Sequence, residues 1–388
     1  MNELNSLVAS SAEMLEALDR PTGLAENLPR AAYTDPHFFQ LELERVFGRN
    51  WTYVGAAGEI PDAGDAIPLT LGAMPIVLVR QRDGTVRAFH NVCRHRGPIL
   101  VEERLKARSA LVCPYHAWSY DLTGELKRTP AYMGSDRHDS GPLDKSCMGL
   151  LAIRCDLWRD GVFVNLSGDA KPLAEVYAPL EKRWSHHDLS LLRYGGSVRL
   201  RINANWKLAM ENFQEGYHLP SVHPFLNSLS SRDNHYSVVE PEYQGQGSHY
   251  YNTVQAGHGD LPNFPDLPEY WRHRAEYPAI LPNMMFGMHP DHFLFFGVLP
   301  LTPSLTEEVF HFYFVGDAAL DARYAPLRER VIQNMQSINA EDIGIVENMQ
   351  RGRHSPGYVK GPFSPYQEAT LHQFQLKIAK MLRAATAP

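Results

Sequence analysis

Residues Cys93 to His116 read CRHRGPILVEERLKARSALVCPYH, and this stretch carries the strongest structural signal in the chain. It holds two short pairs, Cys93-x-His95 and Cys113-x-x-His116, which use two of the four cysteines. Zinc modules more often pair like ligands within one turn, whereas each pair here offers one thiolate and one imidazole. That combination suits a two-iron cluster in which one iron takes the thiolates and the other takes the imidazoles. A single zinc ion held by the same four residues stays open as an alternative.

The sequence around these pairs is typical of a small all-β module. From residue 51 to about residue 165, short strand-like runs such as AIPLTL (66–71) and PIVLVRQ (75–81) alternate with turn signals. Asp83-Gly84 and Thr123-Gly124 are two of those signals, and both favour tight turns between strands. We therefore expect an all-β domain over residues 51–165.

Mixed helical and strand patterns flank this module. In residues 1–50, LVASSAEMLEALDR (7–20) has a helical pattern, and Asp35 with Pro36 has the signature of a second helix start. After residue 166, HFLFFGVLPLT (292–302) and EVFHFYFVG (308–316) predict adjacent antiparallel strands. The sequence thus predicts an α+β protein in which a helical segment, 1–50, packs on a C-terminal domain, 166–388.

Composition excludes several classes of protein. The chain has 388 residues, 37 of them basic and 44 acidic, and a net charge of −7 argues against a nucleic-acid partner. Its first twenty residues lack a basic start followed by an apolar run, so we expect no signal peptide. No uninterrupted apolar run reaches about 18 residues, the length that spans a membrane. Few cysteines and no membrane segment lead us to expect a cytoplasmic protein.

A second group of metal-binding side chains lies in NWKLAMENFQEGYHLPSVHP, residues 205–224. If residues 205–219 form a helix, Glu211, Glu215 and His218 share one face. Pro220 would end that helix, so His223 could return from the next turn and meet His218 at one metal ion. The alternative is that one histidine is a core residue and the other lies on the surface.

A carboxylate ligand is expected from RERVIQNMQSINAEDIGIVENMQRG, residues 328–352. Asp342 falls within an apolar stripe at helical spacing, where a carboxylate is costly unless it is paired or binds a metal. Two histidines and one carboxylate would leave coordination positions open for dioxygen and substrate. A solvated or capping role for Asp342 is the alternative, and Glu341 and Glu347 are expected to be solvated. The stripe consists of Val331, Met335, Ile338, Ile345 and Met349.

Both motifs resemble those of one known family. CRHRG…CPYHAW resembles the Rieske [2Fe–2S] motif, although Ala117 replaces a usual glycine. NWK…ENFxExYH…H and EDIGIVENMQRG resemble the mononuclear iron motif of the Rieske non-haem iron oxygenases. The resemblance implies a Rieske domain followed by a helix-grip catalytic domain with an antiparallel sheet.

The same resemblance implies roles for individual residues. One iron of the cluster would be held by Cys93 and Cys113, and the other by His95 and His116. A mononuclear Fe(II) would be held by His218, His223 and Asp342. Glu215 would connect His218 with the cluster histidine His116 of an adjacent subunit, and Asn212 and Tyr217 would line the iron pocket.

The implied activity is that of a terminal oxygenase that uses O2 to oxidise a small organic substrate. A lone GQG at residues 245–247, expected to be a loop, is not a dinucleotide fingerprint. Electrons would therefore come from a separate NAD(P)H-dependent reductase, with or without a ferredoxin. Members of the family are trimeric or built on trimers, so the resemblance also implies a homotrimer. A Rieske electron carrier and a zinc-stapled binding protein are the alternatives from other classes.

For the substrate, YTDPHFFQLELERVF (33–47) and the glutamate in NFxExYH are similar to the choline and carnitine monooxygenase type. This similarity favours oxidation of an N-methyl or quaternary ammonium carbon, with aromatic-ring hydroxylation as the alternative. A cationic substrate would need an aromatic cage. Candidate cage residues, which could equally pack a core, are Tyr250, Tyr251, Tyr270, Trp271, Phe286, Phe293 and Phe295.

Overall fold

The computed structural model describes residues 13–138 and 140–384. The described chain divides into two compact units, one formed by residues 53–170 and one by residues up to 52 together with those from 171. The N-terminal segment thus falls in the same unit as the C-terminal half. Part of the helix expected over residues 7–20 lies outside the described residues, and its later part forms a helix over residues 13–18.

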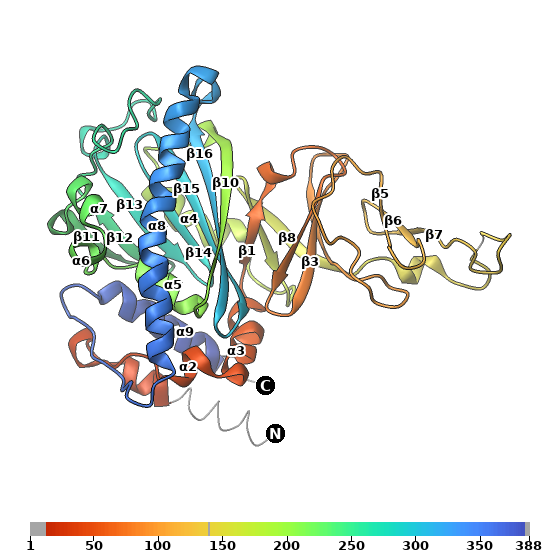
Figure 1. Ribbon diagram of the computed structural model, residues 1–388, viewed down its shortest axis with the longest axis horizontal. Coiled ribbons are helices and arrows are strands. Elements are labelled where there is room, and N and C mark those ends of the chain that lie inside the picture. Colours follow the sequence, from red (N-terminus) through yellow and green to blue (C-terminus); the bar gives the residue numbers. More distant parts are fainter. Residues whose placement is uncertain (1–12, 139, 385–388) are drawn as a thin grey trace. The chain divides into compact units, whose positions relative to one another are not determined.

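The unit of residues 53–170 is built from strands, as predicted (Figure 1). A six-stranded sheet has the order β1-β9-β8-β4-β3-β2, and a three-stranded sheet has the order β5-β6-β7. The strands are β1 (Thr52–Ala56), β2 (Ala66–Leu71), β3 (Met74–Arg80), β4 (Val86–His90), β5 (Ala110–Val112), β6 (Ser119–Asp121), β7 (Leu126–Arg128), β8 (Ala152–Trp158) and β9 (Gly161–Asn165). Two short helices accompany them, η3 (Ala57–Glu59) and η4 (Lys145–Met148).

The other unit contains a seven-stranded antiparallel sheet with the order β10-β16-β15-β14-β13-β12-β11. The two strands predicted from the sequence are adjacent and antiparallel, with Phe296 opposite Phe310. The strands are β10 (Leu192–Ile202), β11 (His235–Val239), β12 (Gln244–Ser248), β13 (Ala275–Ile280), β14 (Met284–Met288), β15 (His292–Thr302) and β16 (Leu305–Val315).

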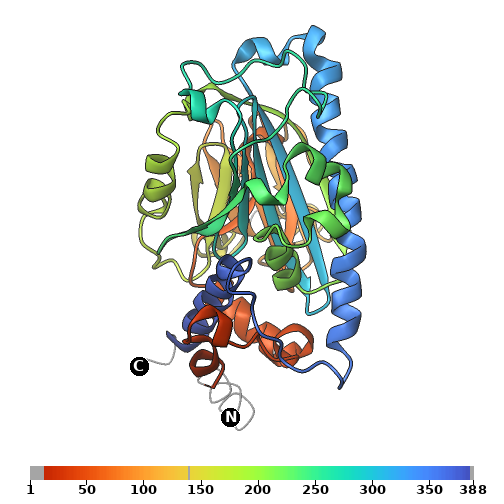
Figure 2. The same cartoon turned by 90° about the vertical axis from the view of Figure 1, so that its left-hand side faces the viewer.

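Helices cover this sheet, and α8 is the longest helix of the described chain (Figures 1 and 2). Its bounds, Ala325–Arg353, include the amphipathic segment expected from the sequence. The other α-helices are α2 (Ala31–Thr34), α3 (Pro36–Glu42), α4 (Leu173–Arg183), α5 (Trp206–Phe213), α6 (Leu219–Val222), α7 (Pro224–Leu229) and α9 (Ala369–Ala384). The shorter helical elements are η1 (Thr22–Leu24), η2 (Leu43–Phe47), η5 (Leu189–Leu191), η6 (Arg232–Asn234), η7 (Glu269–Trp271), η8 (Asp317–Leu320) and η9 (Ala322–Tyr324).

The N-terminal helices are anchored to other helices of the same unit. Asp35 caps α3 by accepting from the backbone of His37, with Pro36 in the first turn, as predicted. At the other end of α3, Glu42 forms a buried ion pair with Lys207 of α5, at 2.6 Å, and also accepts from Trp206 Nε1. Figure 2 shows these N-terminal helices beside α9, where Arg45 donates to a backbone carbonyl.

Three local predictions were wrong. The helix expected over 205–219 ends at Phe213, so Glu211, Glu215 and His218 do not share a helix face. Pro220 lies in the first turn of α6 and starts a helix there, because a first-turn proline needs no intrahelical donor. The GQG segment is not a loop, since it forms most of strand β12.

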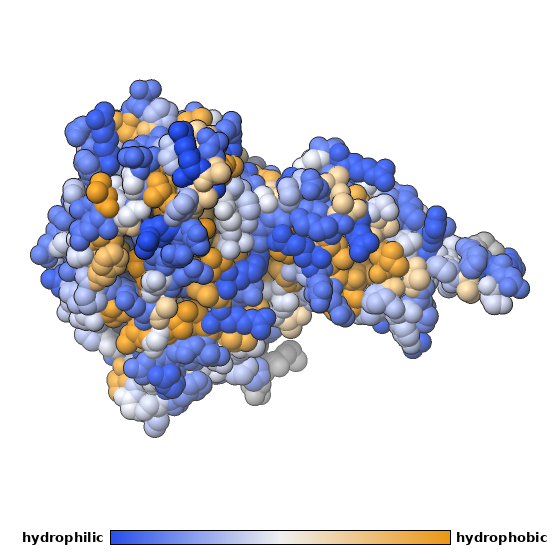
Figure 3. Space-filling model, turned by 45° about the horizontal axis from the view of Figure 1, so that its top comes forward, coloured by the Kyte–Doolittle hydropathy of each residue, from blue (hydrophilic) through white to orange (hydrophobic). Residues whose placement is uncertain are grey.

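Among the described helices, none has the length and apolar composition that a membrane-spanning helix needs. In the space-filling view, hydrophilic and apolar residues are interspersed on the visible face of each unit (Figure 3).

Candidate metal centres and active site

Two loops of the β unit bring the two Cys–His pairs together. Cys93 follows β4 and Cys113 follows β5, and both thiols are buried. The imidazole rings of His95 and His116 lie 4.8 Å apart, and Trp118 stacks on His95 at 4.5 Å. The two imidazoles therefore lie together, and the two thiols contact each other, although each Cys–His pair comes from a different loop.

The loop geometry fits a two-iron cluster better than one zinc ion. Among the described residues, two groups of donor atoms lie within 4.8 Å of one another, and the four loop residues form neither of them. A single ion would require that closer convergence. His116 Nδ1 is buried without a hydrogen-bond partner, and burial raises the pKa of the Cys113 thiol. A buried imidazole nitrogen without a hydrogen-bond partner is suited to bind a metal.

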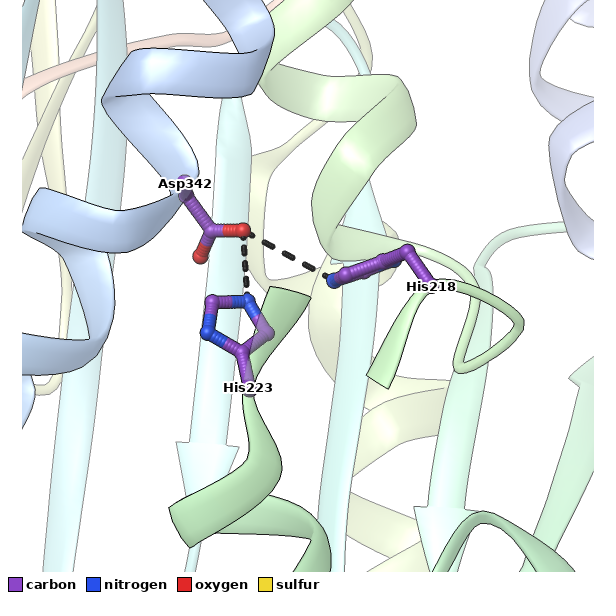
Figure 4. Close-up of side chains that lie close together, drawn as sticks. All are labelled: His218, His223 and Asp342. Carbon is purple, nitrogen blue, oxygen red and sulfur yellow. Dashed lines mark hydrogen bonds and ion pairs between the residues drawn. The ribbon is translucent and has the colours of Figure 1, made fainter. Parts of the chain in front are cut away.

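The second candidate centre joins two segments far apart in the chain. His218 precedes α6, His223 lies between α6 and α7, and Asp342 comes from α8. His223 Nε2 is 2.7 Å and His218 Nε2 is 3.6 Å from the same oxygen, Asp342 Oδ1 (Figure 4). Both Nε2 atoms thus point at one carboxylate, and this is the two-histidine, one-carboxylate set of non-haem iron sites.

Each of the two imidazoles is held from behind by a glutamate. Glu215 Oε1 lies 2.5 Å from His218 Nδ1, and Glu341 Oε2 lies 2.7 Å from His223 Nδ1. Such carboxylate contacts fix the tautomer with the proton on Nδ1 and leave Nε2 free to bind a metal. Asn212 adds a third support, because its Nδ2 donates to Asp342 Oδ1 at 2.6 Å.

The electrostatics of this centre favour a positive charge. Burial by itself lowers the pKa of His223, but hydrogen bonds and charge from Asp342 and Glu341 outweigh it and raise the pKa. A proton on His223 would satisfy these acids in the absence of metal, and a divalent cation would satisfy them when bound. The donor set, its convergence and its acidic surroundings therefore fit a mononuclear iron.

The centre opens into a cavity with a free volume of about 110 Å³ between α8 and the sheet. Aromatic and aliphatic side chains make up nearly half of its lining residues, and histidines, amides and two carboxylates make up the rest. The lining residues are Asn212, Phe213, Glu215, His218, Leu219, His223, Leu226, His235, Gln246, Tyr251, Tyr277, His258, His289, His292, Phe296, Phe310, Val331, Asn334, Met335, Ile338, Asn339 and Asp342.

Two expectations about the acids near this centre were wrong. Glu341 is not simply solvated, because it contacts His223, and Glu347 accepts from both the backbone and the side chain of Asn203. Neither contact has a signal in the sequence around α8, since the partners lie more than 100 residues away. Glu211 turns away from the centre and accepts from Tyr33 and Gln375.

The expected pocket residues are placed only in part. Asn212 lines the cavity, whereas Tyr217 is 51% exposed and is not among the lining residues. Of the expected aromatic cage, Tyr251 alone lines the cavity. Phe293 packs instead against Trp184 on the opposite face of β15, because alternate side chains of a strand point to opposite faces.

Comparison with known proteins identifies the family. Residues 50–143 match the model of the Rieske [2Fe-2S] domain, and residues 189–384 match that of the ring hydroxylating alpha subunit, catalytic domain. The chain belongs to the Rieske non-haem iron oxygenases. The oxygenase therefore has a Rieske [2Fe–2S] domain and a catalytic domain of the type that binds mononuclear iron, as predicted from its two motifs.

Known relatives of the oxygenase span most of its length. The oxygenase subunit of glycine betaine monooxygenase from Chromohalobacter salexigens is 30% identical, over 87% of this chain and 82% of that protein. The chloroplastic choline monooxygenase of Arabidopsis thaliana is 27% identical, over 91% of this chain and 82% of that protein. A solved quaternary ammonium Rieske monooxygenase has the same fold, with a TM-score of 0.79 at 22% identity over 95% of this chain and 98% of that one.

Proposed function

We propose that this oxygenase oxidises a carbon attached to the nitrogen of a methylated ammonium compound. The observation that carries the proposal is the cavity that adjoins His218, His223 and Asp342. Its walls combine the aromatic side chains of Phe213, Tyr251 and Tyr277 with carboxylates, and among the described lining residues there is no lysine or arginine. Such a cavity suits a cation, and the two relatives named above are a glycine betaine and a choline monooxygenase.

We assign the metal ligands from the geometry. Cys93 and Cys113 would hold one iron of the cluster, and His95 and His116 the other. His218, His223 and Asp342 would hold the mononuclear iron, with Glu215 and Glu341 orienting the two imidazoles. The bound iron supplies the activation of dioxygen, and the protein positions the substrate, encloses it and controls the delivery of electrons.

Metal content tests these assignments. Purified oxygenase should contain about three irons per chain, two in the cluster and one mononuclear, and no stoichiometric zinc. Replacing His223 with alanine should remove about one iron and leave the visible spectrum of the cluster unchanged. Loss of the cluster spectrum in that variant, with mononuclear iron retained, would contradict the assignment.

Product analysis tests the reaction. Oxygenase, a reductase and O2 would be incubated in parallel with trimethylammonium compounds and with simple arenes. We expect formaldehyde or an aldehyde from the ammonium compounds and no phenol or diol from the arenes. The reverse pattern would support aromatic-ring hydroxylation. An arene could also pack against the aromatic side chains of Phe296 and Phe310 in the cavity.

We further propose that the electrons come from a separate NAD(P)H-dependent reductase, directly or through a ferredoxin, and that the oxygenase acts as a homotrimer. In that arrangement Glu215 connects His218 to the partner subunit's His116. Light scattering should give three times the 43.9 kDa of one chain. A monomer of full activity would exclude the intersubunit route.

The bridging role of Glu215 has its own test. Glu215→Gln keeps an oxygen that can accept from His218, so both metal centres should remain. Turnover should fall strongly, and the reduced cluster should stay reduced when substrate and O2 are added. Glu347→Gln is the matched control in the same unit and should oxidise substrate at the wild-type rate. Full activity in Glu215→Gln would contradict the bridging role of Glu215.

A further inference from the structure

A second group of titratable side chains lies at the same cavity, and the reaction proposed above makes no use of it. His258, His289 and His292 line the cavity, and Asp291 lies behind them; we call these four residues the histidine cluster. All four are at least 97% buried. A cluster of this kind at a cavity wall raises the question of which part of a ligand it contacts.

A β-hairpin places two of these rings side by side. His289 and His292 flank the two-residue loop Pro290–Asp291 between β14 and β15, and the His289 backbone N–H donates to the His292 carbonyl. Their rings stack at 4.2 Å with an interplanar angle of 12°. Tyr251 meets the His289 ring edge-on at 4.7 Å. The hairpin therefore presents a rigid, preformed surface to the cavity.

The hydrogen bonds of Asp291 define which ring nitrogen carries the proton in its two histidine partners. Although burial alone would raise it, the adjacent His292 and His258 hold the pKa of Asp291 well below its usual value, so the carboxylate is ionised. His258 Nδ1 lies 2.8 Å from Asp291 Oδ2, and His292 Nδ1 lies 2.7 Å from Asp291 Oδ1. An ionised carboxylate only accepts, so both rings carry their proton on Nδ1. Burial lowers the pKa of His292, so its ring is neutral and its other nitrogen, Nε2, is an acceptor.

His289 differs from its neighbours because neither of its ring nitrogens has a hydrogen-bond partner in the described chain. Its side chain is 97% buried, and burial holds its pKa well below the usual value. A neutral imidazole offers one donor and one acceptor. Leaving both unpaired in a buried place is costly, and a polar ligand group that reaches one of them would remove part of that cost.

The cluster lies at a distance from the metal centre that a small ligand can bridge. Asn334 of α8 donates to the carbonyl of Ala256, in the loop that carries His258, at 2.7 Å. Asp342 follows eight residues later on the same helix, which is about 12 Å along the axis. A ligand with its methyl group at the metal centre would therefore extend its opposite end towards the cluster.

We propose that the histidine cluster binds an uncharged hydroxyl group at the far end of a methylated ammonium substrate. This inference rests on the proposed function and narrows its substrate class to amino alcohols. The hydroxyl would accept from the His289 N–H and donate to Nε2 of His292, whose ring stacks on that of His289. A carboxylate at this place would face ionised Asp291 across one ring, and no lysine or arginine is among the described lining residues to neutralise it.

The experiment compares three ligands that share a trimethylammonium group. Choline carries a hydroxyl, n-propyltrimethylammonium carries a methyl in its place, and glycine betaine carries a carboxylate. Calorimetric titration of the holoenzyme should show choline binding about tenfold more tightly than either of the others, since the alternatives leave buried polar groups unpaired. Equal or tighter binding of glycine betaine, or no advantage over the propyl compound, would overturn the proposal.

Two matched variants localise the effect. His289→Phe keeps a ring of similar size and removes both nitrogens, so choline should lose its advantage while the propyl compound binds as before. His187→Phe is the control, because His187 is also buried and packs between Phe264 and Trp271 away from the cavity. Its ligand preference should equal that of the wild type. An unchanged choline advantage in His289→Phe would contradict the assignment, as would a fourth stoichiometric metal that disappears in that variant.

Failure of the inference can be told from failure of the proposed function. If all three ligands bind and are oxidised but glycine betaine is preferred, the proposed function stands and the role of the histidine cluster is wrong. If none of the three binds, both are wrong.

Discussion

At the scale of single residues, the most informative contacts are those behind the metal-binding side chains. His218 and His223 could be found from their spacing, but Glu341 could not. It lies on the exposed side of α8 by its apolar pattern, and the structure shows it 2.7 Å from His223 Nδ1. Helical periodicity reports which side faces the core, whereas a contact with a residue 118 positions away depends on how two elements pack.

We expect Glu341→Gln to weaken the mononuclear site selectively. Loss of the charged acceptor behind His223 should lower iron affinity by about 10- to 100-fold. The [2Fe–2S] cluster, which lies in the other unit, should keep its visible spectrum and serves as an internal standard. Glu347→Gln, on the same helix but bonded to Asn203, should bind iron like the wild type. Equal iron affinity in both variants would show that Glu341 does not support the ligand.

Backbone conformation in the cluster loops leads to a second prediction. Gly97 and Ala117 both have positive φ, at 79° and 58°. A Cβ on Gly97 would meet nothing closer than a Val92 methyl at 4.0 Å, so the conformation rather than space limits that position. Gly97→Ala should lower the free energy of unfolding by about 1 kcal/mol, and Ala117→Gly should raise it by a similar amount, because L-residues are strained at positive φ. Chemical unfolding monitored through the cluster spectrum would measure both; changes of the same sign would be inconsistent with this strain.

At the scale of elements, α5 shows how one sequence motif serves two purposes. NWK at its start anchors the helix: Asn205 caps it, and Lys207 forms the buried ion pair with Glu42 of α3. ENF at its end holds Asn212 against Asp342. The sequence predicts a metal site from this motif. In the structure, NWK positions α5, and ENF at the end of the same helix contacts the metal site.

Glu211 of α5 should make stability depend on pH. Burial raises its pKa to about 6, against 4.5 for an unperturbed glutamate. The folded state therefore keeps a proton that the unfolded chain releases, so the stabilisation is full below pH 4.5 and is lost as the pH rises through 6. The loss should be about 2 kcal/mol.

Denaturant unfolding of Glu211→Gln and of the wild type at pH 4.5 and pH 7 measures this term. Glutamine does not titrate, so the variant should not lose this stability. Its free energy of unfolding relative to that of the wild type should therefore increase by about that amount from pH 4.5 to pH 7. A stability difference that is the same at both pH values would show that Glu211 is ionised in the folded protein throughout this range.

At the scale of the whole molecule, two units with separate cores hold the two metal centres. Calorimetry of the holoenzyme should resolve two unfolding transitions, because such units unfold as separate cooperative blocks. A chelator that removes the mononuclear iron should lower only the transition of the catalytic unit, since a ligand stabilises only the fold that binds it. A parallel shift of both transitions, with the cluster spectrum intact, would contradict the separation.

The sequence by itself determined the chemistry: two Cys–His pairs in a β module, two histidines after α5, and an aspartate on α8. Spacing within each segment carries this information, whereas the meeting of Asp342 with the two histidines depends on how α8 packs. Only the tertiary structure decided which side chains line the cavity. The expected cage failed at Phe293 and Phe295 because the two faces of a buried strand are equally apolar, so periodicity could not tell which face meets the cavity. Glu341, Asn212 and the histidine cluster acquire their partners through long-range packing of α8, the β14–β15 hairpin and the loop before η7, and this packing depends on the whole core.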